Sequence, residues 1–200
     1  MPGISSVDVI SVLLISGSAR DGSTNVAALR TAAAVAGDDV DAVLFGGIAE
    51  LPLFNPDDDR EGVPIDPRVA AMRAAVSAAD ALLLCTPEYA GALPAALKNL
   101  FEWTIGDAST YRTSVAWINA AGPAAPSGAA DAHESLAKVL RYAGAEIVDG
   151  ACVRVPVTRD MVGSDGLISD DGARAAIAAA LTALLDHARA RAREAGVPKT

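Results

Sequence analysis

The stretch "LLISGSARDGSTNVAALR", from Leu13 to Arg30, joins a short apolar run to an alanine-rich segment through small polar residues. The apolar run is typical of a buried strand, and Ser, Thr and Asn before the alanines are typical of the start of a helix. A strand that turns at a glycine into a helix presents free backbone N–H groups and the positive end of the helix dipole at one place. The stretch therefore predicts an anion site at this first turn.

The side chains of the turn support this prediction. Hydroxyl, amide and guanidinium donors are offered by Ser18, Arg20, Ser23, Thr24 and Asn25. The same residues also fit an ordinary turn in which Ser23 or Asn25 caps the helix and Arg20 is solvated. Two common nucleotide loops are excluded, because there is no Gly-Lys-Ser/Thr and because Ala19 stands where the dinucleotide fingerprint needs its second glycine. A single phosphate held by hydroxyls and backbone is favoured.

Short apolar runs alternate with helical segments along the rest of the chain. The expected strands are Val9–Ile15, Val40–Phe45, Ala81–Cys85, Ser114–Asn119 and Glu146–Val155, the last with a candidate break near Gly150. The expected helices are Thr24–Ala36, Pro67–Ala79, Leu93–Trp103, Ala129–Ala143 and Asp171–Ala195. Strands without polar alternation are buried on both faces, so helices must cover a parallel sheet above and below. We predict a single domain over residues 1–200, an α/β three-layer sandwich with a five-stranded parallel sheet.

The composition limits the partners of the chain. Its 200 residues are 52% hydrophobic and carry a net charge of −9, and such an acidic surface repels nucleic acids and anionic membranes. No apolar run approaches the roughly 20 residues that span a bilayer, and Met1–Ser6 lacks the features of a secretory signal. We therefore expect a soluble cytoplasmic protein with no nucleic-acid and no membrane partner. Cys85 and Cys152 adjoin apolar runs, which indicates buried thiols and not a disulfide.

A second informative stretch, "TPEYAGALPAALKNLFEW", covers residues 86–103. It follows the third expected strand, at the same edge of the sheet as the first turn. Pro87 and Gly91 predict an irregular loop, and Tyr89 places an aromatic ring beside exposed backbone. Such a loop can lie along a flat heterocycle. It also fits a rigid connection in which Tyr89 and Trp103 are core or interface residues. Two further long connections, 46–66 and 122–128, follow expected strands and are expected at the same ligand-binding edge.

The two stretches resemble known motifs. Gly17-Ser18-Ala19-Arg20-Asp21-Gly22-Ser23-Thr24-Asn25 resembles the Gly-Ser-x-Arg-x-x-Ser-x-Asn phosphate loop of the NADPH-dependent FMN reductase family. Pro87-Glu88-Tyr89, with Pro94 and Leu97-Lys98-Asn99 downstream, resembles that family's Pro-Glu-Tyr-Asn…Pro-x-x-Leu-Lys-Asn segment. The resemblance extends over most of the chain. The family includes flavin, quinone, azo-dye and chromate reductases with a flavodoxin-like fold.

The resemblance implies a cofactor site for FMN. The phosphate would be held by Ser18, Arg20, Ser23, Thr24 and Asn25, the ring and ribityl chain would adjoin Pro87, Glu88, Tyr89, Ala90 and Gly91, and the other side of the ring would adjoin Ala120, Ala121 and Gly122. Ala90 stands where the family usually has asparagine, and Ala92 where a small polar residue is common. Contacts at these two positions must therefore come from backbone or apolar atoms.

The resemblance also implies an FMN-dependent oxidoreductase. NADPH or NADH would reduce the flavin, and a small acceptor (a quinone, a flavin, an azo compound or a metal oxyanion) would take the electrons. No catalytic acid or base is expected, because the flavin carries the chemistry. The alternative is a flavodoxin-type electron carrier, whose sheet and phosphate loop look similar and whose acidic surface suits docking on basic partners. The chain has only three Phe, three Tyr and two Trp with which to cover a flavin ring, and this scarcity favours the enzyme.

Three further expectations concern assembly, two motif residues and metals. The apolar segment Leu51–Phe54 together with Trp103 predicts a homodimer or homotetramer. Lys98 and Asn99 fit several roles, namely a helix cap, an acid partner, a subunit contact or a cofactor contact. The two histidines have no partner ligands at metal spacing, and the acidic run Asp57–Asp59 fits a solvated loop, so no metal site is expected.

Overall fold

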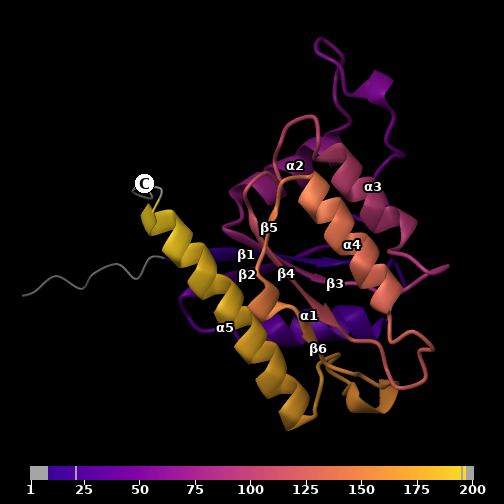
Figure 1. Cartoon of the computed structure of the whole chain (residues 1–200), viewed down its shortest axis with the longest axis vertical. Helices are drawn as coiled ribbons and strands as arrows, with labels where there is room; N and C mark the ends of the chain where they lie inside the picture. The colour runs from indigo at the N-terminus through magenta and orange to yellow at the C-terminus, as the bar shows by residue number, and fades with distance from the viewer. Residues whose placement is uncertain (1–8, 21, 195, 197–200) are drawn as a thin grey trace, which may run out of the picture.

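A parallel sheet forms the centre of the molecule, which the computed structural model describes over residues 9–20, 22–194 and 196 (Figure 1). Its strands are β1 (Ile10–Ser16), β2 (Val40–Phe45), β3 (Ala81–Cys85), β4 (Ser114–Asn119), β5 (Glu146–Ile147) and β6 (Val153–Arg154). They are ordered β2-β1-β3-β4-β5, and β6 also pairs with β4. This order is that of the flavodoxin-like fold, which confirms the expected fold class.

The fifth strand position of the sheet is divided. Glu146 in β5 pairs with Ser114 at the start of β4, and Val153 in β6 pairs with Ile118 near its end. A 3-10 turn at Asp149–Ala151 separates the two short strands. The expected break near Gly150 is therefore confirmed.

Five helices cover the two faces of the sheet in the described part of the chain. Helices α1 (Thr24–Ala34) and α5 (Asp171–Glu194) pack on one face, and α2 (Pro67–Ala78), α3 (Ala95–Trp103) and α4 (Ala130–Tyr142) pack on the other (Figure 1). Ala195, the expected end of the last helix, lies outside the described residues. Within the described residues, no helix combines the length and apolar character that a membrane span requires.

Successive residues of β1 show how the two cores form. Val12 and Leu14 are buried against α1 and α5, whereas Leu13 and Ile15 are buried against the three helices of the opposite face. This is the period of two expected for a strand with both faces covered. The edge strand β2 departs from the expectation of full burial, since Asp41 and Val43 are exposed on it.

The long loop after β2 is held by buried contacts and not simply solvated. The Asp59 carboxylate pairs with the Arg73 guanidinium at 2.8 Å, and both side chains are mostly buried. Arg73 Nε also donates to the Trp103 carbonyl at 2.6 Å. The expectation of a fully solvated acidic run is therefore wrong for Asp59, whose ion pair fixes the loop to α2 and α3.

Candidate functional site

The first wall of the site begins where β1 and β3 approach each other closely. Gly17 N–H donates to the Cys85 carbonyl at 2.9 Å. A Cβ built on Gly17 would overlap the Thr86 side chain. A glycine is therefore required at position 17 by the contact between two strand ends, in addition to the turn that the sequence indicated.

The turn from β1 into α1 is ordered by its own side chains. Ser18 N–H donates to Ser16 Oγ at 3.1 Å, and Arg20 N–H donates to Ser18 Oγ at 3.3 Å. Ser23 is the N-cap of α1, and its Oγ accepts from Asn25 N–H at 3.2 Å. The hydroxyl hydrogens of Ser18 and Ser23 have no acceptor among the described residues, and the first turn of a helix leaves backbone N–H groups without intrahelical acceptors. Asp21 lies outside the described residues.

Asn25 is fixed from beneath the turn. Its Nδ2 donates to Ser23 Oγ at 3.2 Å, and its Oδ1 accepts from the Cys85 thiol at 3.3 Å. Complete burial raises the pKa of Cys85 to about 12, so the thiol stays protonated and can act as the donor. Asn25 is thus held in place by the end of β3, and it holds the Ser23 cap in turn.

The second wall is a tight turn after β3. Tyr89 and Ala92 exchange two backbone hydrogen bonds, at 3.0 and 3.2 Å, and Ala90 and Gly91 between them have φ values of 52° and 73°. Two successive positive φ values in a two-residue hairpin loop define a type I′ turn. Pro87, Glu88 and Tyr89 face the site, whereas Ala90 and Gly91 form the exposed tip of the turn.

The third wall is the loop after β4. Asn119 Oδ1 accepts from Ala121 N–H at 3.0 Å, and Asn119 Nδ2 donates to the Gly128 carbonyl at 2.8 Å. The Glu88 carboxylate joins the second wall to the third, because it accepts from Ser127 Oγ at 2.8 Å and from Ala132 N–H at 3.2 Å. Glu88 is therefore engaged in holding the two loops together.

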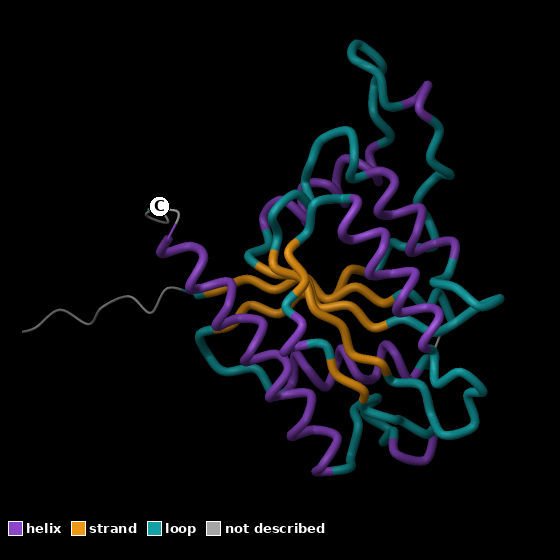
Figure 2. The backbone as a smooth tube through the Cα atoms, in the orientation of Figure 1, coloured by secondary structure: helices purple, strands orange, loops and turns teal. Residues whose placement is uncertain are grey.

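The three walls enclose a pocket of about 470 Å³. Figure 2 shows the loops after β1, β3 and β4 grouped at one end of the strands. The lining residues that the sequence predicted are Ser18, Arg20, Ser23, Thr24, Asn25, Pro87, Glu88, Tyr89, Ala120, Ala121 and Gly122. The predicted residues Ala90 and Gly91 do not line the pocket. Its volume lies within the roughly 300–1,000 Å³ typical of small-molecule sites.

Four residues that line the pocket were not predicted from the sequence, namely Ala125, Pro126, Ser127 and Ala129. They lie in and just after the 122–128 connection, whose length marked it as a candidate ligand loop. Residue type gave no further signal, because two of the four are alanines. Ala129 has φ 60° and is held by its N–H bond to Ser127 Oγ at 3.1 Å.

Lys98, Asn99 and Trp103 lie outside this pocket. Asn99 is buried on α3, donates to the Pro52 carbonyl at 2.9 Å and accepts from Phe54 N–H at 2.8 Å. Trp103 Nε1 donates to the same Pro52 carbonyl at 2.8 Å, and the ring is only 1% exposed. Lys98 pairs with Glu102 at 2.6 Å on the exposed side of the helix. Trp103 is thus a core residue, as one interpretation of the sequence predicted, whereas its expected place beside Leu51–Phe54 in an exposed apolar patch is wrong.

His133 lies on α4, next to the third wall, and its ring is held by a backbone carbonyl and an aromatic neighbour. Its Nδ1 is 2.6 Å from the Ala129 carbonyl, and its ring adjoins Trp117 with centroids 5.9 Å apart. Burial lowers the pKa of His133, which favours the neutral ring. Among the described residues, no group of three His, Cys, Asp or Glu side chains is placed to hold a metal ion.

The chain is similar in sequence to known flavin and quinone reductases. Residues 10–159 match the sequence pattern of the NADPH-dependent FMN reductase family. An NAD(P)H-dependent FMN reductase of Pseudomonas aeruginosa is 32% identical over 177 residues, which make up 88% of this chain and 94% of that protein. A probable NADPH:quinone oxidoreductase of Oryza sativa is 37% identical over 106 residues, 52% of this chain and 51% of that protein.

The fold has a counterpart among solved structures. The flavoenzyme NAD(P)H:(acceptor) oxidoreductase of Paracoccus denitrificans has a TM-score of 0.71 with 22% sequence identity. The match covers 90% of this chain and 99% of that one. Together with the sequence matches, which cover the phosphate-loop and ring-loop motifs, these findings show that the chain belongs to the NADPH-dependent FMN reductase family.

Proposed function

We propose that this protein is an FMN-dependent NAD(P)H oxidoreductase that passes electrons from NADPH or NADH to a small acceptor. The observation that carries the proposal is the 470 Å³ pocket, which has a hydroxyl-rich helix start at one end and, at the other, the Pro87–Tyr89 segment facing a loop of small residues. An anionic group suits the first end, and a flat ring suits the second. FMN combines the two in one molecule.

The residues present fit FMN. At the phosphate end, Ser18, Ser23 and Thr24 offer hydroxyl donors, Arg20 offers a positive charge, and α1 offers its N-terminal dipole. Asn25, fixed by Cys85, keeps the cap residue Ser23 in position. At the ring end, Ala120, Ala121 and Gly122 bring backbone close to the pocket. A Cβ on Gly122 would lie 3.3 Å from the Val157 carbonyl, so this approach leaves little room for a larger residue.

The protein's part in the reaction is to bind, orient and leave one face open. Bound FMN would supply the redox chemistry, accepting a hydride from the nicotinamide and giving electrons to the acceptor. Backbone N–H groups of the second and third walls would stabilise negative charge at the edge of the ring. Glu88 would keep those walls at a fixed separation through its contacts with Ser127 and Ala132. No side chain is assigned as a catalytic acid or base.

The acceptor is proposed at the level of chemical class. The name of the rice relative supports a quinone, and the family membership supports a free flavin. Azo compounds and metal oxyanions are further acceptors that could approach an open flavin face.

We infer that residues 1–200 act as one FMN-binding unit, and that the protein works in the cytoplasm, where reduced nicotinamide nucleotides are available.

We also propose a homodimer or a dimer of dimers. Leu53 is 83% exposed next to the anchored Pro52, and Ile105, which follows α3, is 43% exposed. Exposed apolar side chains on an acidic protein suit a subunit contact. Light scattering of the FMN-loaded protein at micromolar concentration should give at least twice the monomer mass, and Leu53→Asp should lower it. A monomer for the wild type would refute this assembly.

Steady-state kinetics test the proposed function. The purified protein with FMN should oxidise NADPH or NADH only when an acceptor such as a quinone, a flavin or an azo dye is added. The pattern should be ping-pong, because nicotinamide and acceptor need the same open face. Turnover that requires a separate reductase protein would instead identify an electron carrier.

A further inference from the structure

A second pocket lies on the other side of the phosphate loop. It has a volume of about 280 Å³ and shares Ser18, Arg20 and Ser23 with the first pocket. The remaining walls come from α1, from the end of β2 and the residues after it, and from the loop 162–166. One loop therefore separates two sites at the same edge of the sheet.

The second pocket carries two arginines, Arg20 and Arg30. Within residues 9–20, 22–194 and 196, neither guanidinium has an ion-pair partner, although the protein as a whole has a net charge of −9. None of the described lining residues is an Asp or Glu. Arg20 also lines the first pocket, where it is proposed to hold the FMN phosphate, so Arg30 is the cation that the second pocket offers to another anionic ligand.

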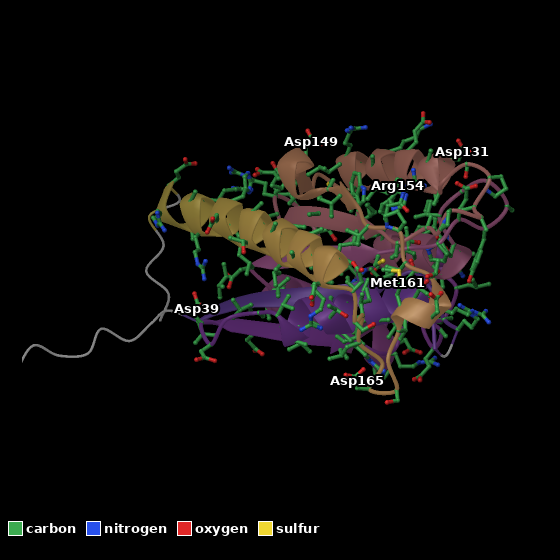
Figure 3. All side chains as sticks on the ribbon, turned by 90° about the horizontal axis from the view of Figure 1, so that it is seen from below. Asp39, Asp131, Asp149, Arg154, Met161 and Asp165 are labelled. Atoms are coloured by element: carbon green, nitrogen blue, oxygen red, sulfur yellow. The ribbon has the colours of Figure 1, made fainter. Side chains whose placement is uncertain are left out.

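Arg30 is placed by the surrounding backbone. A Cβ on Gly166 would lie 3.2 Å from Arg30 Nη1, so the guanidinium packs against a residue that has no side chain. The next residue of α1, Thr31, accepts at its Oγ1 from Ile168 N–H at 2.9 Å and thereby ties the same loop to the helix. Asp165 is the acidic residue of this loop. Its carboxylate accepts from Leu167 N–H at 3.0 Å, and Figure 3 shows it at the outer tip.

Part of the lining of the second pocket is apolar. It is formed by Val26 of α1, by Leu44 and Phe45 at the end of β2, and by Ile48 and Ala49 just after it. An apolar lining of this kind suits the face of an aromatic base, while Arg30 suits a phosphate. The pocket therefore has the two features needed by a nucleoside phosphate.

The position of the pocket narrows the choice of nucleotide. In dinucleotide-binding α/β folds, whose glycine fingerprint this chain lacks, a carboxylate about 20 residues after the phosphate loop binds the ribose 2′-hydroxyl, and a nearby arginine accommodates a 2′-phosphate. Here the described lining after β2 has no carboxylate, and Arg30 faces it from α1. We propose that the second pocket binds the adenosine 2′-phosphate of NADPH. This rests on the proposed function, because it assumes that the reductant delivers its nicotinamide to the flavin in the first pocket.

Arg30 allows the second pocket to be tested without disturbing the first. Arg20 lines both pockets, whereas Arg30 lines only the second. Arg30→Ala is therefore the test variant. The control is Arg141→Ala, since Arg141 is an exposed arginine on α4, on the opposite face of the sheet, with no ion pair among the described residues.

The experiment is calorimetric titration of the FMN-loaded protein with adenosine 2′,5′-bisphosphate and with 5′-AMP, which lacks the 2′-phosphate. The wild type and Arg141→Ala should bind the bisphosphate at least about tenfold more tightly than AMP. Arg30→Ala should lose most of this difference and keep its affinity for FMN. In turnover, Arg30→Ala should raise the KM for NADPH more than the KM for NADH.

Equal binding of the two nucleotides by the wild type would overturn the proposal, and so would an unchanged preference in Arg30→Ala. The AMP half of FAD also combines an aromatic base with a phosphate, so FAD is the alternative ligand of the second pocket. If Arg30→Ala weakens FAD but not FMN, while the bisphosphate and AMP bind equally, the pocket serves FAD and the proposal is wrong. A different result would contradict the proposed function itself: a wild-type protein that does not bind FMN, or that does not turn over with NADPH or NADH.

Discussion

Ala90 adopts a backbone conformation that an alanine rarely adopts. Its φ of 52° lies in the left-handed region, where a Cβ costs about 1–2 kcal/mol, yet the type I′ turn of Tyr89 to Ala92 requires it. Asparagine, the usual residue here in the family pattern, tolerates this region better. The alanine at position 90 therefore strains the turn and makes the protein less stable than a residue that tolerates a positive φ would.

Replacing this alanine should stabilise the protein. We expect Ala90→Gly to raise the free energy of unfolding by about 0.5–1 kcal/mol, since the relief of strain exceeds the extra entropy of glycine in the unfolded chain. Ala92→Gly, at an ordinary φ two residues away, should lower it instead. Urea unfolding measures both. Equal effects of the two substitutions would contradict the assignment of strain to position 90.

Arg20 gives the phosphate end of the first pocket its positive charge. We expect Arg20→Ala to weaken FMN binding about ten- to a hundredfold, the effect of losing one charge-assisted hydrogen bond of about 1.5–3 kcal/mol. Riboflavin has no phosphate and should bind the wild type and the variant alike. Fluorescence titration measures both affinities. Wild-type FMN affinity in the variant would place the phosphate elsewhere.

At the scale of elements, α3 anchors the long loop after β2. Both side-chain amide atoms of Asn99 are bonded to the backbone of that loop, at Pro52 and Phe54. Asn99→Ala should therefore lower the free energy of unfolding by about 1–3 kcal/mol, because it leaves the Phe54 N–H without its acceptor and removes one of the two donors to the Pro52 carbonyl. Lys98→Ala, which removes an exposed ion pair one residue away, should change it by less than about 0.5 kcal/mol. If both variants lose the same stability in urea unfolding, the anchoring role is wrong.

The elements themselves were largely predictable from the sequence. Apolar runs and helix-start signals located β1 to β4 and all five described helices within one or two residues, because burial on both faces leaves a continuous apolar run. Burial in β2 was overestimated, since an edge strand and an inner strand have similar composition. The role of Gly17 was only partly predictable, because the clash with Thr86 depends on the packing of two distant strands.

The topology of the sheet determines the position of the site. Strand order brings the ends of β1, β3 and β4 to one edge, so most residues of the predicted site line one pocket. Ala125 to Ser127 were not predicted, because small residues in a loop carry no chemical signal of their own. The sequence fitted Trp103 both to a core position and to an exposed patch, and only the packed structure, in which its indole N–H is bonded to Pro52, decides for the core.

The proposed function requires that this chain hold FMN with one face open to a nicotinamide. The most direct measurement is rapid mixing of the FMN-loaded protein with NADPH or NADH under anaerobic conditions, with no other protein present. We expect the visible flavin absorbance to be lost within seconds and to return when a quinone is added, because the small residues of the third wall leave room for an approach to about 3–3.5 Å. Absorbance that persists for many minutes, and falls only after a separate reductase is supplied, would contradict the account.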